Sequence, residues 1–179
     1  MAAPAATGAL AMAWNAIQLE MIDRLGDDGL AIARQLAMTT YRSEADFESR
    51  FGRQLEADGR LSIASYLQYQ GHKLVERFDP ATYRILVRAM DLHDIGRNRG
   101  GIVAALGLLA AAGTRLTGLG ITGDILYGPG QVQALVAAAT EAGVAATYRE
   151  LASAKGHDAF LVEWDQLGAV LREALDGVS

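Results

Sequence analysis

The chain has 179 residues and contains no cysteine, so disulfides, thiolate metal sites and cysteine nucleophiles are excluded. Hydrophobic residues make up 51% of the chain and charged residues 21%, which is the composition of a folded globular protein rather than a disordered segment. The formal net charge of −5 offers no basic field to a phosphate backbone, so we expect neither nucleic acid nor an anionic membrane as a partner.

Residues 1–95 are predicted to form a helical cap. The spacing of apolar residues from about 13 to 91 is helical, and Pro80 stands where a helix would begin. Residues 1–13 are rich in alanine but lack the basic segment of a secretory signal. The apolar spacing therefore predicts a helical unit, and the lack of a secretory signal predicts a cytoplasmic protein.

Helix start signals subdivide this cap. Ser43 followed by Asp46 predicts a capping box. Ser62 is expected to cap a helix that runs through Phe78. The next helix is predicted to begin at Asp79-Pro80, with the aspartate as N-cap and the proline at the first helical position.

Residues 96–179 are predicted to alternate helices and strands. After a charged, glycine-containing loop at 91–101, we expect a helix at 102–112, a strand at 115–122, a helix at 131–142, a strand at 144–151 and a helix at 161–175. The apolar stretch at 102–112 is too short to cross a bilayer, which needs about 20 residues. Strands separated by helices pair in parallel, and such sheets normally contain more than two strands. The predicted fold class is therefore α/β, with a helical cap and the last parallel strands and helices of an incomplete sheet.

Two polar side chains follow the two predicted strands. Asp124 comes after the first strand, and His157 comes after the second, in the string GHDAF at 156–160. Functional groups gather at the carboxyl ends of strands in open α/β sheets, so the two can meet. An Asp loop followed by a His loop matches the end of the Ser, Asp, His chain order of α/β hydrolases, in which Asp124 would orient the imidazole and His157 would activate a hydroxyl. Spacing alone leaves open that both are ordinary loop or capping residues.

Two other patterns have competing interpretations. Gly118, Gly120 and Gly123 have the spacing of a dinucleotide fingerprint, but a proline-containing turn separates them from the next predicted helix. His93 and Asp94 stand beside two arginines, which suits a phosphate or CoA contact, although a polar loop between cap and sheet is the simpler interpretation. The three histidines show no close pairing, so no metal site is expected.

Several strings of the sequence resemble the homoserine O-acetyltransferase family. They are residues 30–53 (LAIARQLAMTTYRSEADFESRFGR), 65–101 (SYLQYQGHKLVERFDPATYRILVRAMDLHDIGRNRGG), 123–127 (GDILY) and 156–168 (GHDAFLVEWDQLG). The strings YRS, RFGR, LHD and GHDAFL in this order are together specific. The resemblance implies an α/β-hydrolase fold and acyl transfer from acyl-CoA to the hydroxyl of homoserine, in methionine biosynthesis, through a serine nucleophile. It implies no bound cofactor, with acetyl-CoA or succinyl-CoA as co-substrate.

The resemblance also assigns residues to roles. It places the triad aspartate at Asp124, the triad histidine at His157 and substrate-binding residues at Arg34, Tyr41 and Asp158. The first two of these substrate residues are seven positions apart, about two helical turns, so their side chains leave the same face. A guanidinium suits the substrate carboxylate, and a carboxylate can accept from its ammonium group. Without the resemblance, the arginine would be interpreted as solvent-facing and the tyrosine as a core aromatic.

None of the six serines stands in the setting expected of the nucleophile. That serine should lie in a glycine-flanked elbow between a strand and a helix, next to the oxyanion hole. The resemblance indicates that the chain begins after the family's nucleophile, most of its sheet and its oxyanion loop. We therefore expect no homoserine acetylation by this chain alone.

The incomplete sheet also predicts association. Uncovered apolar faces favour an oligomer or a poorly folded monomer, so the expected partners are homoserine and either a second copy of the chain or a missing N-terminal half. A non-catalytic helical dimerisation or docking module remains an alternative, as does a fragment of another α/β hydrolase. The sequence leaves acetyl and succinyl donors, and homoserine and serine acceptors, undecided.

Overall fold

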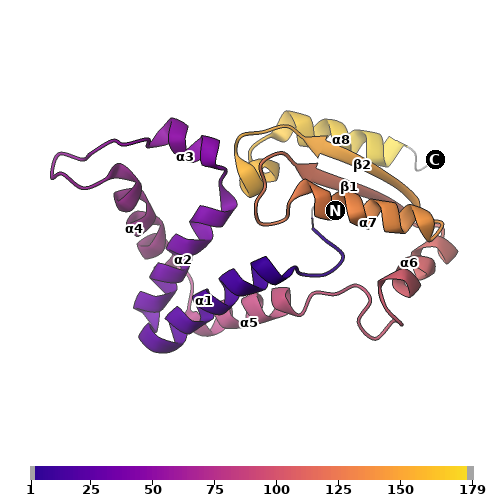
Figure 1. The fold of residues 1–179 in the computed structure, drawn as a ribbon, viewed down its shortest axis with the longest axis horizontal. Coiled ribbons are helices and arrows are strands. Elements are labelled where there is room, and N and C mark those ends of the chain that lie inside the picture. The colour runs from indigo at the N-terminus through magenta and orange to yellow at the C-terminus, as the bar shows by residue number, and fades with distance from the viewer. Residues whose placement is uncertain (1–2, 177–179) are drawn as a thin grey trace.

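The computed structural model describes residues 3–176 of the chain. Figure 1 shows α1 to α5 gathered on one side of the molecule and the strands β1 and β2, flanked by helices, on the other. The first part contains α1 (Ala9–Leu25), α2 (Asp27–Tyr41), α3 (Glu44–Arg50), α4 (Ser62–Val75) and α5 (Pro80–Asp91). The second part contains α6 (Ile102–Ala111), β1 (Arg115–Ile121), α7 (Pro129–Glu141), β2 (Ala145–Leu151), the short 3₁₀ helix η1 (Gly156–Leu161) and α8 (Trp164–Asp176).

Two of the predicted helix caps are present. The Ser43 hydroxyl accepts a hydrogen bond from the backbone N–H of Asp46 at 3.1 Å, and the Asp79 carboxylate accepts from that of Thr82 at 2.9 Å. Each side chain thus satisfies an amide that has no partner inside its helix. The return half of the capping box is not formed, because the Asp46 carboxylate turns away to Lys155, 3.0 Å distant.

The prediction that Ser62 caps a helix through Phe78 is wrong. Leu61 is the N-cap of α4, Ser62 is the first helical residue, and the helix ends at Val75. Leu61 is held in an extended conformation by an antiparallel bridge to Leu55. This bridge within the turn before α4 fixes where the helix begins and overrides the serine signal.

The cap is held together by a core between α1, α2 and α4. Ile22, Leu30 and Leu74 are buried there, one from each helix. A Cβ at Gly71 of α4 would lie 2.6 Å from the carbonyl oxygen of Ala31 on α2. The glycine therefore lets the two helices approach more closely than any other residue would allow.

The strands β1 and β2 form a parallel pair connected by α7. Their register runs from Arg115 opposite Ala145 to Ile121 opposite Leu151. The predicted order of helix, strand, helix, strand and helix is confirmed, with most boundaries within two residues. Within residues 3–176 each strand has one neighbour, so both outer edges of the pair are unpaired.

Alternating side chains cover the two faces of this pair. Leu116 packs with α6 and α7 in a cluster that buries Leu106, Leu135, Ala139 and Val144. On the other face, Leu119, Ile121 and Leu151 pack against η1 and α8. The alternation follows from the two-residue period of a strand. The ends of both strands therefore lie between the layer of α6 and α7 and the layer of η1 and α8.

The last predicted helix needs a correction. It begins at Trp164 rather than residue 161, and the segment predicted as a loop is the 3₁₀ helix η1. The backbone N–H of Val162 bonds to the Ala159 carbonyl, and Gly156 has a positive φ of 67°, so the chain turns twice within a few residues. Glycine favours the first of these turns because other residues are strained at such a φ.

The polar loop after α5 pairs with the N-terminal segment. The backbone N–H of Ile95 donates to the Ala5 carbonyl at 2.9 Å, and His93 Nε2 lies 3.1 Å from the Pro4 carbonyl oxygen. The predicted division into residues 1–95 and 96–179 stays a prediction. The two parts are in contact, because α2 of the cap packs against η1 of the second part. Within the described residues, no helix combines the length and apolarity needed to cross a membrane.

Candidate active site

Asp124 and His157 lie together at the carboxyl ends of the two strands. Asp124 Oδ2 is 2.8 Å from His157 Nδ1. The other carboxylate oxygen, Oδ1, accepts from the backbone N–H groups of Leu126 and Tyr127 at 2.8 and 2.9 Å. Asp124 is only 6% exposed, so its position is fixed by the turn after β1. A fixed carboxylate on Nδ1 selects the ring orientation and leaves Nε2 to act on a ligand.

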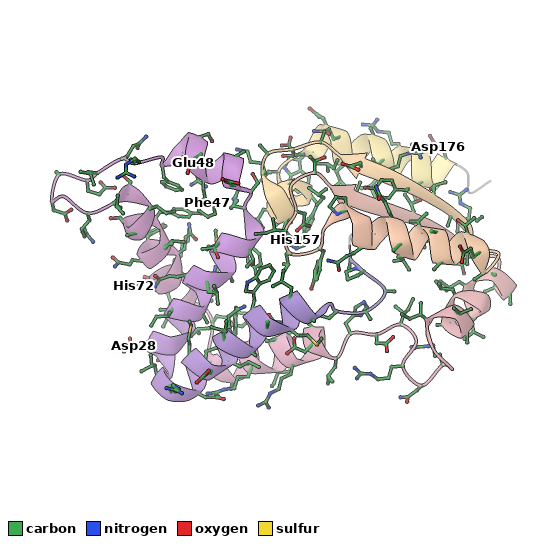
Figure 2. All side chains as sticks on the ribbon, in the orientation of Figure 1. Asp28, Phe47, Glu48, His72, His157 and Asp176 are labelled. Atoms are coloured by element: carbon green, nitrogen blue, oxygen red, sulfur yellow. The ribbon has the colours of Figure 1, made fainter. Side chains whose placement is uncertain are left out.

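Aromatic rings surround the imidazole. Figure 2 shows His157 between the cap and the strand pair. Its ring centroid lies 5.9 Å from that of Tyr41, 5.4 Å from that of Tyr127 and 5.5 Å from that of Phe160. The side chain is 17% exposed, and no residue of the described part of the chain hydrogen-bonds to Nε2. Among the described residues, this nitrogen therefore has no hydrogen-bond partner that would compete with a ligand.

Arg34 and Tyr41 share one face of α2, as their spacing predicts. The guanidinium carbon of Arg34 lies 5.3 Å from the centroid of the Tyr41 ring. Burial raises the pKa of Tyr41, Arg34 opposes this effect and Asp158 adds to it. The phenol thus remains a hydrogen-bond donor at neutral pH. Among residues 3–176, no carboxylate lies within ion-pair distance of Arg34, which leaves its charge available to an anionic ligand.

A cleft of about 640 Å³ opens next to the two tyrosines that contact the imidazole, although His157 itself does not line it. Arg34 and the two tyrosines that contact the His157 ring, Tyr41 and Tyr127, line it, with Phe78 and Val87 among the apolar side chains of its wall. This volume lies within the range of about 300 to 1,000 Å³ that is usual for small-molecule sites. An apolar cleft with one cation fits a ligand that carries an anionic group.

Asp158 has a counter-ion that the sequence did not indicate. Its Oδ2 lies 3.3 Å from Nε of Arg42, and each of the two side chains is about four-fifths buried. Arg42 belongs to the string YRS, but an ion pair between residues so far apart in the chain leaves no local pattern. Asp158 must therefore share its charge between Arg42 and any substrate ammonium group.

A second buried carboxylate was also missed as a candidate. Asp46 is 1% exposed, and three cations converge on it: Lys155 Nζ at 3.0 Å, Arg50 Nη1 at 3.3 Å and Arg42 Nη1 at 3.8 Å. Burial alone would raise the pKa of Asp46, but hydrogen bonds from Lys155 and Arg50 and the nearby positive charges lower it below its usual value. The carboxylate is therefore ionised and paired throughout the neutral range.

No described serine is placed to serve as the nucleophile of His157. Ser43 lies beside the site, but its hydroxyl donates to the Ala154 carbonyl and accepts from the Asp46 N–H. Among residues 3–176, no serine hydroxyl is hydrogen-bonded to His157. Ser179, the last serine considered from the sequence, lies outside the described residues.

The glycines with dinucleotide-like spacing serve packing. A Cβ at Gly118 would lie 2.4 Å from a Val136 methyl, and one at Gly120 would lie 2.1 Å from the Tyr148 hydroxyl. The helix that follows, α7, begins only at Pro129. The space beside these glycines is filled by side chains, so it offers no room for a pyrophosphate.

The fold and the Asp–His pair define a class of protein. Parallel strands followed first by an Asp loop and then by a His loop are the arrangement of an α/β hydrolase, and the helical cap lies over the same edge. The structure of esterase E22 superposes with a TM-score of 0.80 at 18% identity, covering 93% of this chain and 51% of that one. The chain therefore has a partial α/β-hydrolase fold.

Sequence comparison gives a narrower relationship. Over 154 residues the chain is 40% identical to the homoserine O-acetyltransferase of Moorella thermoacetica, covering 82% of this chain and 40% of the relative. It is 37% identical to the homoserine O-acetyltransferase of Thermobifida fusca, covering 98% of this chain and 50% of the relative. The resemblance to the homoserine O-acetyltransferase family is thus confirmed, and the chain spans half or less of the length of these relatives. No family model matches the chain.

Solved structures agree with this relationship. Homoserine O-acetyltransferase from Staphylococcus aureus superposes with a TM-score of 0.75 at 30% identity, covering 96% of this chain and 48% of that chain. The enzyme of the same name from Bacillus anthracis gives a TM-score of 0.85 at 16% identity, with 96% and 51% covered, and supports the fold alone.

Proposed function

We propose that this chain contributes the Asp–His pair and the substrate cap of an acyltransferase that acylates the hydroxyl of homoserine in methionine biosynthesis. The observation that carries the proposal is the 2.8 Å contact between Asp124 Oδ2 and His157 Nδ1, near a cleft lined by Arg34, which has no carboxylate partner among the described residues. The similarity to homoserine O-acetyltransferases supports the choice of reaction. The serine nucleophile would come from polypeptide beyond this sequence.

The chemistry assigns the imidazole as a proton carrier. His157 Nε2 takes the proton of the serine hydroxyl while the serine oxygen attacks the thioester carbon of acyl-CoA. Collapse of the tetrahedral intermediate expels the CoA thiolate, which takes up the proton from the imidazolium and leaves as the thiol. Homoserine then attacks the acyl-serine, its hydroxyl proton passes through the same nitrogen, and the serine is regenerated. Asp124 stabilises the imidazolium in both half-reactions.

The acceptor would be held by groups of the cap and of η1. Arg34 would bind the homoserine carboxylate through charge-assisted hydrogen bonds, and the protonated phenol of Tyr41 would donate a further bond. Asp158 would accept from the ammonium group while remaining paired with Arg42. This arrangement favours an α-amino acid over a simple alcohol, because both charges of the ligand find a partner.

Acyl-CoA would be the co-substrate, with no permanently bound cofactor. Such a biosynthetic enzyme would work in the cytoplasm. Its macromolecular partner would be either a second copy of this chain or an N-terminal half that carries the missing strands. The unpaired outer edges of β1 and β2 among the described residues support the second choice.

A chimera tests the proposal. This chain replaces the segment that it matches in the Thermobifida fusca enzyme, and homoserine acetylation is measured with acetyl-CoA. We expect the chimera to acetylate homoserine and the chain alone to show no activity, because His157 needs a serine to activate.

Two controls sharpen the result. The chimera with His157→Gln should be inactive, and the chimera with His72→Gln, which alters an exposed histidine of α4, should be as active as the parent. A folded chimera that binds acetyl-CoA but does not acylate homoserine would refute the proposed acceptor. Turnover by the isolated chain would refute the need for a separate serine.

A further inference from the structure

We propose that Asp46 is a positioning residue for His157. Through Lys155 and Arg42 it holds both sides of the segment that carries the imidazole, so that the contact between His157 and Asp124 is kept. The importance of this for catalysis rests on the function proposed above, but the positioning itself can be measured without it.

The ion pairs of Asp46 flank His157 in the sequence. Lys155, two residues before the histidine, is bound directly by the Asp46 carboxylate at 3.0 Å. Asp158, the residue after the histidine, is reached through Arg42, whose Nη1 lies 3.8 Å from Asp46 and whose Nε lies 3.3 Å from Asp158. One buried carboxylate of the cap is thus connected to residues on both sides of His157, directly to Lys155 and through Arg42 to Asp158.

Backbone contacts bring the same two segments together. The hydroxyl of Ser43 donates to the carbonyl of Ala154, which precedes Lys155. A Cβ at Gly156 would lie 2.7 Å from the backbone nitrogen of Ser43. The end of α2 and the start of α3 therefore lie directly against η1, at a distance that only glycine permits.

The charge of Asp46 matters because three cations meet at it. Without the carboxylate, Lys155, Arg42 and Arg50 would repel one another in a partly buried site. Lys155 is the most exposed of the three, at 44% of its side chain, so it would move into solvent most readily. Its movement would free the turn at Gly156 and, with it, the ring of His157.

The substitution Asp46→Asn isolates this charge. The asparagine keeps the size of the side chain and leaves intact the backbone N–H that Ser43 caps. The control is Asp58→Asn, which removes the same charge from an exposed pair with Arg60. Lys155→Met removes only the partner of Asp46 on the His157 segment, and Asp46→Glu restores the charge.

The readout is the imidazole of His157 in the complete chain, labelled with ¹⁵N and observed by NMR. Its signals are assigned by their loss in His157→Gln. We expect Asp46→Asn to shift the ring nitrogen signals and to speed solvent exchange of the ring N–H by about tenfold, because the segment opens locally. Lys155→Met should give a smaller change in the same direction, Asp46→Glu should return the signals toward wild type, and Asp58→Asn should change nothing.

Two outcomes would overturn the inference. The first is a folded Asp46→Asn protein whose His157 signals match those of wild type. If that variant does not fold, unchanged His157 signals in Lys155→Met overturn it instead. The two proposals can also fail separately. If the wild-type ring signals report the Asp124 contact but the chimera is inactive, the proposed function is refuted and the positioning role of Asp46 is not.

Discussion

Two buried carboxylates contact the segment that carries His157, Asp124 at the ring itself and Asp46 at Lys155, and they are neutralised in different ways. Asp124 is held by two backbone N–H groups and by an imidazole, whose charge can change. Asp46 is surrounded by a lysine and two arginines, which stay charged. A carboxylate paired with an imidazole can stabilise the imidazolium that forms during proton transfer. A carboxylate paired with lysine and arginine side chains stabilises the structure instead. The same residue type thus has two uses within one site.

The largest expected effect concerns Asp124. In the chimera, Asp124→Asn should lower kcat by about 10⁴-fold, because the amide no longer stabilises the imidazolium and favours the wrong tautomer. Thermal stability should change little, since the remaining carbonyl oxygen can still accept from Leu126 and Tyr127. Steady-state kinetics measures kcat, and thermal unfolding measures stability. A large loss of stability with a modest loss of kcat would show that Asp124, like Asp46, mainly stabilises the structure.

The next effect concerns Arg34, the arginine that lines the cleft. Arg34→Ala should raise the KM for homoserine by about 30- to 100-fold, which corresponds to loss of a charge-assisted pair worth about 2 to 3 kcal/mol. The KM for acetyl-CoA should not change. Arg24→Ala, on the exposed face of α1, serves as the control. An unchanged homoserine KM would remove Arg34 from the acceptor site.

A smaller effect concerns stability through Asp46. Its pKa is lowered from 3.8, so the unfolded carboxylate takes up a proton at a higher pH than the folded one. The resulting stability is complete above about pH 3.8 and is lost as the pH falls through the lowered pKa. Asp46→Asn should therefore cost about 2 kcal/mol at pH 7, a value reduced from that of a fully buried pair because Lys155 and Arg50 are partly exposed.

Urea unfolding at several pH values measures this difference. The gap in unfolding free energy between wild type and Asp46→Asn should narrow as the pH falls below about 3.8 and through the lowered pKa of the folded carboxylate. Asp58→Asn should show a much smaller gap, because its ion pair is exposed. A gap that is independent of pH would mean that packing, and not charge, is what the asparagine disturbs.

The smallest effect concerns the close approach at Gly156. Gly156→Ala and Gly59→Ala both place alanine at a positive φ, 67° and 84°, and both should cost about 1 kcal/mol in backbone strain. Only the first adds a clash with Ser43, since nothing lies within 4 Å of a Cβ at Gly59. Calorimetry should therefore show a Tm loss of about 3 °C for Gly59→Ala and about twice that for Gly156→Ala. Equal losses would show that η1 and α2 are not in rigid contact.

Local sequence patterns predicted the elements better than the contacts between them. The strand after Arg115 and the cap at Asp79 follow from alternation and from a short side chain next to proline, both of which act within a few residues. The meeting of Asp124 and His157 also followed from the sequence, because parallel strands end at the same edge.

The missed features depend on partners that the local capping and periodicity signals do not include. Leu61 rather than Ser62 is the N-cap of α4, where it forms a bridge to the nearby Leu55. Asp46 looked like half of a capping box, yet its carboxylate pairs with Lys155, more than 100 positions away. Arg42 and Asp158 pair across a similar separation. Ion pairs of this kind have no period and no spacing, so only the folded chain reveals them.

The seam between Ser43 and Ala154 has a consequence for how the molecule folds. These residues are separated by 111 positions, so their contact closes a longer loop than the pairing of β1 with β2 through α7, at an added entropic cost of about 1 kcal/mol. Because this entropy must be lost before the contact can stabilise the chain, contacts of high sequence separation form slowly. The cap and the strand pair can thus be formed while the imidazole is still free to move. In such a chain, the contacts that form last are the ones that place the imidazole of His157.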